Sequence, residues 1–233
     1  MNLTLQTIPS PLISELLTHS DLDGVVLDME HGHFDNQTLY SCIQVITLQK
    51  KQCFVRFTTL DKQLVRMCLD AGVDGVIFST IENTIEAKEI INYCKYPSQG
   101  GIRGCGLVRE NKWGEYPLDY HKPIIIGQIE TQKAIDNIKD LINCEFDLFL
   151  IGPYDISSSL KIPGQFGNSI FLDYINKVYN IVPIEKLGLF LPTKKDIDNY
   201  KKIENKERPM LLIWGMDTNF ILESIKIINT QLW

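Results

Sequence analysis

Short apolar runs and helical repeats alternate along the 233-residue chain. The apolar runs have the length and composition of buried parallel strands. Between most of them, apolar residues recur at spacings of three and four, which is typical of amphipathic helices. The predicted strands are Leu3–Gln6, Gly24–Leu27, Cys53–Phe57, Gly75–Phe78, Ile124–Gln128, Asp147–Ile151, Leu187–Leu191 and Met210–Trp214. The predicted helices are Asn36–Leu48, Asp61–Ala71, Asn83–Cys94, Ala134–Ile142, Ile170–Ile181, Lys194–Ile203 and Thr218–Ile228.

Eight strands that alternate with helices indicate an α/β protein with a closed parallel sheet, the (β/α)8 TIM barrel. An open doubly wound sheet is the alternative, because the eighth strand and the closure are inferred by counting. No Pro/Gly/Ser-rich linker or block of charge interrupts the chain, so we expect one domain over residues 1–233. One loop, Pro97–Lys122, contains no convincing helix, and loops of this length are often functional.

Composition narrows the class of protein. A formal net charge of −6 and a pI of about 5.3 argue against nucleic acid or an anionic membrane as partner. The segment Met1–Gln6 lacks the basic start of a signal peptide, and no apolar run approaches membrane-spanning length. The six cysteines include no CxxC pair, which favours buried thiols over a disulfide framework. We therefore expect a reduced, cytoplasmic protein.

Two carboxylates follow predicted strands. Glu130 comes just after Ile124–Gln128, and Asp155 comes just after Asp147–Ile151. In an α/β fold, catalytic groups gather at the C-terminal ends of the strands. Two acidic groups that converge there, with Gln128 beside them, are typical of oxygen ligands for a hard divalent cation.

Structural interpretations of the same residues remain open at this point. Glu130 and Asp155 could instead cap the helices that follow them, and Arg56 could simply pair with a neighbouring carboxylate. No lysine occupies the C-terminal end of a predicted strand, because Lys122 and Lys186 precede strands. A Schiff-base mechanism needs such a lysine, so a metal is the favoured electrophile.

Several motifs together resemble one family along nearly the whole chain. They are DMEHGHFD (Asp28–Asp35), VR (Val55–Arg56), LDAGVDGV (Leu69–Val76), YPSQGGIRGCG (Tyr96–Gly106), QIET (Gln128–Thr131), IGPYDIS (Ile151–Ser157) and WGMDT (Trp214–Thr218). The chain resembles the HpcH/HpaI aldolases, the metal-dependent class II pyruvate aldolases. The resemblance implies a lyase that cleaves or forms a 4-hydroxy-2-oxo acid, giving pyruvate and an aldehyde through a metal-bound pyruvate enolate.

The resemblance also implies roles for residues and an assembly. Glu130 and Asp155 would bind a divalent Mg, Mn, Co or Zn ion. The substrate would be held by Arg56, Gln128, Gly152 and Pro153. Proton transfer would fall to His31, oriented by Asp28, and Asp70 would contribute from a neighbouring subunit. The partners would be a small 2-oxo acid, an aldehyde, and further copies of the chain in a trimer or hexamer built through an exchanged C-terminal helix.

Departures from the family pattern affect the aldehyde side of the pocket. The family often has Pro-Met-Val where this chain has Ser79-Thr80-Ile81, and Tyr154 stands where a small residue is common. Two other functions remain open: a CoA-ester lyase of the citrate-lyase β-chain type, and a barrel that binds an oxo acid without turnover. No basic cluster for a CoA nucleotide stands out, and Asp28, His31 and Arg56 exceed what a binder needs.

Overall fold

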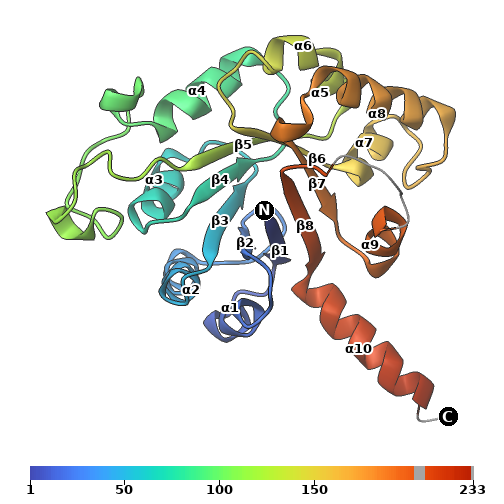
Figure 1. Ribbon diagram of the computed structural model, residues 1–233, viewed down its shortest axis with the longest axis horizontal. Coiled ribbons are helices and arrows are strands. Elements are labelled where there is room, and N and C mark those ends of the chain that lie inside the picture. Colours follow the sequence, from blue (N-terminus) through green and yellow to red (C-terminus); the bar gives the residue numbers. More distant parts are fainter. Residues whose placement is uncertain (202–207, 232–233) are drawn as a thin grey trace.

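The strands form a closed parallel barrel. The computed structural model describes residues 1–201 and 208–231, and its strands follow the order β1-β2-β3-β4-β5-β6-β7-β8, with β8 pairing back to β1 (Figure 1). The strands are β1 (Asn2–Gln6), β2 (Gly24–Asp28), β3 (Gln52–Phe57), β4 (Gly75–Phe78), β5 (Ile124–Ile129), β6 (Leu148–Ile151), β7 (Leu187–Leu191) and β8 (Leu211–Met216). The predicted (β/α)8 barrel is confirmed, and the open sheet is excluded because both edges are paired.

Helices surround the barrel and connect its strands (Figure 1). They are α1 (Pro11–Thr18), α2 (Asn36–Leu48), α3 (Lys62–Asp70), α4 (Thr84–Cys94), α5 (Gln132–Asp136), α6 (Ile138–Leu141), α7 (Pro153–Ser159), α8 (Ser169–Ile181), α9 (Lys194–Lys201) and α10 (Asp217–Gln231). The sequence did not predict the short helix α1, and it predicted α5 and α6 as one helix. Residues 202–203 of the predicted helix Lys194–Ile203 lie outside the described residues. The long loop Pro97–Lys122 contains only two 3-10 turns, Pro97–Gln99 and Lys112–Gly114.

Polar side chains fix several helix starts. Asp35 and Asn83 accept backbone N–H bonds at the starts of α2 and α4, and Asp61 does the same for α3. At the start of α5 the cap is Thr131, whose hydroxyl accepts from the Ala134 N–H. The capping role considered for Glu130 therefore belongs to the next residue.

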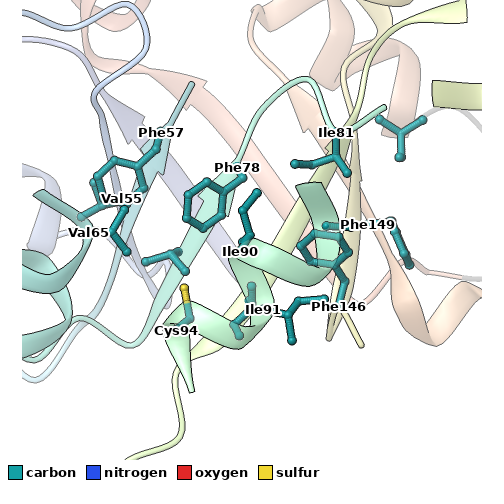
Figure 2. Packing of buried hydrophobic residues seen from close by; sticks show 14 of the residues in the cluster. Val55, Phe57, Val65, Phe78, Ile81, Ile90, Ile91, Cys94, Phe146 and Phe149 are labelled. Atoms are coloured by element: carbon teal, nitrogen blue, oxygen red, sulfur yellow. The ribbon is translucent and has the colours of Figure 1, made fainter. Parts of the chain in front are cut away.

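The core has two layers. One layer fills the space between strands and helices, and Figure 2 shows part of it, with Phe57 beside Phe78 and Phe146 beside Phe149. The second layer is a separate cluster inside the barrel. Its members are Leu3, Leu5, Val26, Phe54, Ile77, Ile126, Leu148, Leu150, Leu211 and Ile213. Because side chains alternate across each strand, the residues two positions further on also face inward.

That alternation places the polar site above the inner layer. Asp28 follows Val26 by two residues, Arg56 follows Phe54, and Gln128 follows Ile126. The register of β2 and β3 places Asp28 opposite Arg56. An apolar plug thus closes the barrel below a polar floor at the C-terminal strand ends, where (β/α)8 enzymes carry their active sites.

The last helix, α10, projects away from the barrel (Figure 1). Large apolar side chains along it are 40–55% exposed, namely Phe220, Ile221, Leu222, Ile225, Ile227 and Ile228. No helix in the described part of the chain combines the length and apolar character needed to cross a bilayer. These exposed apolar side chains are spread along α10.

Candidate active site

Arg56 and Asp28 form a buried, two-bond ion pair at the C-terminal ends of β3 and β2. Arg56 Nε donates to Asp28 Oδ1 over 2.9 Å, and Nη2 donates to Oδ2 over 2.8 Å. Burial alone would lower the pKa of the guanidinium, but the hydrogen bonds and charge of Asp28 outweigh it and raise the pKa. The fork geometry fixes the plane of Arg56 as well as its charge.

A second carboxylate also holds Arg56. Glu30, two residues beyond Asp28, places Oε2 3.1 Å from Arg56 Nη1. The backbone N–H of Glu30 donates to Asp28 Oδ1 over 3.0 Å, which ties the loop after β2 to the same carboxylate. The guanidinium therefore lies between two acidic side chains and has no freedom to swing away from the site.

Glu130 is buried, and each of its carboxylate oxygens accepts a hydrogen bond. It is 4% exposed, and Thr80 Oγ1 donates to its Oε1 while Gln128 Nε2 donates to its Oε2. Burial raises the pKa of Glu130 above its usual range. The Thr80 hydrogen bond opposes this shift, and the charges of Glu30 and Asp155 add to it. The carboxylates of the site are thus close enough to repel one another.

Gly152 makes close approach to Glu130 possible. It follows β6 directly and precedes Pro153, the first residue of α7. A Cβ at Gly152 would lie 3.0 Å from Gln128 Nε2 and 3.0 Å from Glu130 Cβ, contacts that would force a side chain to move. Asp155 lies in the first turn of α7, exposed above Glu130, and Gly152 itself is the N-cap. Asp155 is therefore not the cap that the sequence left open.

The charges of the site suit a divalent cation. Four carboxylates, those of Asp28, Glu30, Glu130 and Asp155, share a single arginine, which Asp28 and Glu30 already occupy. This leaves Glu130 and Asp155 without a cationic partner among the described residues, and hard cations prefer such oxygen ligands. Across residues 1–201 and 208–231, no three His, Cys, Asp or Glu side chains are placed to hold a metal together. The candidate donor set is therefore limited to the two carboxylates of Glu130 and Asp155.

Comparison with known proteins agrees with this geometry. A sequence model of the HpcH/HpaI aldolase/citrate lyase family matches residues 8–212. The chain belongs to this family. A 4-hydroxy-2-oxovalerate aldolase of Rhodococcus jostii (strain RHA1) is 29% identical over 158 residues, which are 65% of this chain and 61% of that protein. A 4-hydroxy-2-oxo-heptane-1,7-dioate aldolase of Escherichia coli (strain ATCC 8739) is 30% identical over 166 residues, 68% of this chain and 63% of that protein.

A solved structure shares the fold of this family member over its full length. An HpcH/HpaI aldolase/citrate lyase family protein of Burkholderia cenocepacia J2315 superposes with a TM-score of 0.88, at 21% identity, covering 100% of this chain and 94% of that one. At this identity the likeness shows the barrel alone. The chain spans about three fifths of the length of the curated relatives it matches.

Asp28 and His31, which we expected to act as a pair, are not hydrogen-bonded to each other among the described residues. The Asp28 oxygens accept from Arg56 and from the Glu30 N–H. His31 is exposed, and within the described part of the chain it makes no hydrogen bond or ion pair. It lies on the loop after β2, three residues beyond Asp28.

Asp70 lies at the other end of the barrel. It ends α3, and helices of this fold run opposite to their strands, so it faces the N-terminal strand ends. Its Oδ1 accepts from Arg103 Nη2 over 2.9 Å. The neighbouring Asp74 confirms the location, since its N–H bonds Cys53 at the start of β3. Asp70 is thus separated from Arg56 by the length of the barrel, as a residue serving another subunit would be.

The backbone and amide groups expected to bind substrate have partners of their own. The Gly152 N–H donates to the Ile129 carbonyl over 3.1 Å, and Pro153 has no N–H. Gln128 Nε2 is directed to Glu130, while Gln128 Oε1 is buried and has no hydrogen-bond partner among the described residues. The Gly-Pro turn therefore shapes the site through close packing.

Two residues of the site had no role assigned from the sequence. Glu30 lies inside the motif that carries Asp28, and the two-residue period of the strand was the signal that could have placed it on the inner face. Thr80 is the second residue after β4, at the strand end where site residues gather. Its φ of 55° is unusual for a β-branched residue, and such strain costs about 1–3 kcal/mol. No pattern in the sequence predicts that conformation.

Proposed function

We propose that this chain is a metal-dependent aldolase that cleaves, or forms, a 4-hydroxy-2-oxo acid and so interconverts it with pyruvate and an aldehyde. The observation that carries the proposal is a fixed arginine, Arg56, beside two carboxylates that lack a cationic partner, Glu130 and Asp155, at the catalytic end of a (β/α)8 barrel. The names of the curated relatives support the reaction class.

Glu130 and Asp155 would hold a divalent cation, with Mg, Mn, Co and Zn as the candidates. When bound, such an ion supplies Lewis-acid stabilisation of negative charge on substrate oxygens. Glu130 is suited to the task because Thr80 and Gln128 fix its orientation, and Asp155 is suited because it is exposed beside it.

Arg56 would stabilise the enolate. Breaking the C3–C4 bond of a 2-oxo acid leaves the enolate of pyruvate, with negative charge developing on the C2 oxygen. A guanidinium carries five N–H groups; in Arg56 three nitrogen contacts are made to Asp28 and Glu30, so other N–H groups remain for a substrate oxygen. A fixed donor of this kind is typically worth about 3 kcal/mol of barrier.

His31 would accept the proton of the C4 hydroxyl as the carbon–carbon bond breaks. His31 is exposed three residues beyond Asp28, and imidazole side chains commonly serve as general bases in catalysis. Because Asp28 is committed to Arg56, we propose that His31 reaches its working position by loop movement or substrate contact and that Asp28 acts on the reaction through Arg56.

The proposal includes a homo-oligomer, a trimer or hexamer, as the working form. The apolar side chains of α10 are half exposed along a helix that leaves the barrel, and an exposed patch of this size commonly marks an interface. Asp70, at the opposite end of the barrel from Arg56, would act on a second copy. Small-molecule oxo acid and aldehyde would be the other partners.

Exchange of the pyruvate methyl protons in D₂O, followed by NMR, tests the proposal without knowledge of the aldehyde. Enolisation of bound pyruvate is the half-reaction that any such aldolase performs. We expect exchange with added Mg or Mn, none after EDTA, and none in Glu130→Gln. Glu89→Gln is the matched control, because it removes the same charge from Glu89 of α4, which forms an exposed ion pair with Lys62 of α3. Absence of exchange from folded protein with every metal would overturn the proposal.

A further inference from the structure

Thr80 adopts a backbone conformation that its side chain disfavours. It lies in the loop between β4 and α4 with φ of 55°. Among the described residues, five non-glycine residues have a positive φ, and they are Lys50, Thr80, Lys112, Trp113 and Lys161. Thr80 is the β-branched member of this set, and branching at Cβ makes the left-handed region most costly. Glycine would take this position without strain.

The neighbours of Thr80 impose the conformation. The Ser79 N–H donates to the Phe57 carbonyl over 2.9 Å, and the Ile81 N–H donates to the Gln128 carbonyl over 3.2 Å. Both Ser79 and Ile81 are fully buried, and Ile81 packs in the outer core layer near α4 (Figure 2). The loop is thus anchored to β3 on one side and to β5 on the other without help from the Thr80 side chain.

The Thr80 side chain is used at the site instead. Although the residue is exposed, its hydroxyl donates to Glu130 Oε1 at 2.5 Å. Gln128 Nε2 donates to the other oxygen, and Gly152 packs against the Glu130 side chain. These three contacts fix the position and plane of the carboxylate. Of these three contacts, the Thr80 hydrogen bond is the one made by an exposed loop residue.

We propose that Thr80 is a positioning residue that holds the Glu130 carboxylate in the orientation in which it binds a divalent cation. The inference rests on the proposed function, because it takes Glu130 as a metal ligand. A carboxylate oxygen has two lone pairs, so one can accept from Thr80 while the other faces the ion. Hydrogen-bond partners of this kind orient metal ligands, and their loss typically weakens metal binding by about 10–100-fold.

Three substitutions separate the hydroxyl from the shape and strain of the residue. Thr80→Val keeps the branched shape and removes the hydroxyl. Thr80→Gly removes the hydroxyl and also relieves the left-handed strain, and Thr80→Ser keeps the hydroxyl. Titration of metal-depleted protein with Mn²⁺, read by EPR and calorimetry, measures affinity directly and does not depend on turnover.

We expect Thr80→Val and Thr80→Gly to bind Mn²⁺ about 10–100-fold more weakly, and Thr80→Ser to bind close to the level of the parent. Thr80→Gly should melt at the same temperature as the parent or higher, so that weaker binding cannot be attributed to a damaged fold. Weak binding together with a lower melting temperature in Thr80→Gly would count against a positioning role.

The outcomes distinguish this inference from the proposed function. If the parent binds Mn²⁺, Glu130→Gln does not, and both Thr80→Val and Thr80→Gly bind as tightly as the parent, the role of Thr80 is wrong and the metal site stands. If the parent binds no Mn²⁺, or Glu130→Gln binds it equally well, the metal site and the role of Thr80 both fall.

Discussion

Arg56 bonds Asp28 through Nε and Nη2, and this pair joins β3 to β2 at the floor of the candidate active site. Asp28 is fully buried and Arg56 is 5% exposed. Glu30 forms an ion pair with a third nitrogen of Arg56, Nη1. The guanidinium of Arg56 is thus fixed in place by the protein before any substrate arrives. Electrostatic catalysis requires this kind of preorganisation.

Two replacements of Arg56 should distinguish its contribution to stability from its contribution to the reaction. Arg56→Ala leaves Asp28 buried without its partner, which typically costs about 3–5 kcal/mol of stability. Arg56→Lys keeps a charge but cannot bond both oxygens of Asp28. We expect it to fold and to lose about 100-fold or more in pyruvate proton exchange. Denaturant unfolding and NMR exchange measure the two effects.

Arg66→Lys on the exposed face of α3 is the control for the arginine-to-lysine change. It should behave as the parent in both assays. Exchange in Arg56→Lys at the rate of the parent would show that the two-bond geometry has no part in the reaction.

Gly152→Ala should disturb Glu130 directly. The added methyl would lie 3.0 Å from Glu130 Cβ and 3.2 Å from its Oε2, and overpacking of this kind costs about 1–3 kcal/mol. We expect weaker Mn²⁺ binding and slower exchange. In Gly167→Ala, where nothing lies within 4 Å of the new methyl, neither should change. Equal Mn²⁺ affinity in the two variants would exclude a spatial role for Gly152.

Glu130→Gln should stabilise the metal-free protein at neutral pH while it abolishes Mn²⁺ binding. Burial raises the pKa of Glu130, so folding favours its protonated form. Its contribution to stability is present at low pH and is lost as pH rises through the folded pKa. Gln mimics the protonated form at every pH. Chemical unfolding at pH 7 and pH 4 should therefore show a gain over the parent that is larger at pH 7.

Affinity for the cation should fall as pH falls, and should begin to fall above the range of an ordinary carboxylate. A proton on Glu130 competes with the ion, and the raised pKa moves this competition upward from the usual value of 4.5. Below the pKa the apparent Mn²⁺ affinity should drop about tenfold per pH unit, for one competing proton. Calorimetric titrations from pH 5 to pH 8 would reveal the slope. An affinity that stays constant down to pH 5 contradicts a raised pKa at a ligand.

Charges placed on α10 should break up the oligomer. Ile221 and Ile225 are four residues apart, share one side of the helix, and are 45% and 48% exposed. If a second copy covers them, Ile221→Glu with Ile225→Glu should cost about 3 kcal/mol or more per interface. Light scattering after size-exclusion chromatography would show a smaller species, still folded by circular dichroism. Asn229→Glu on the same helix is the control, and an unchanged mass for the double variant would exclude α10 as the contact.

Much of the site could be located from the sequence, because strand ends are a local property. The apolar runs before Asp28, Arg56, Glu130 and Asp155 end at the places where the barrel strands end, to within a few residues. A short apolar run between turns has few alternatives in an α/β chain. The short helix α1 escaped prediction because its eight residues give too little periodicity to recognise.

The sequence by itself determined the alternation of strands and helices and the rim that carries the acidic residues, because the pattern of apolar positions follows the burial of each element. Only the tertiary structure decided the pairings within the rim. Asp28 bonds Arg56 and leaves His31 free, Thr80 grips Glu130 from 50 positions away, and Asp70 lies at the opposite end. These choices depend on strand register and barrel closure, which bring distant residues to within bonding distance and which no local pattern encodes.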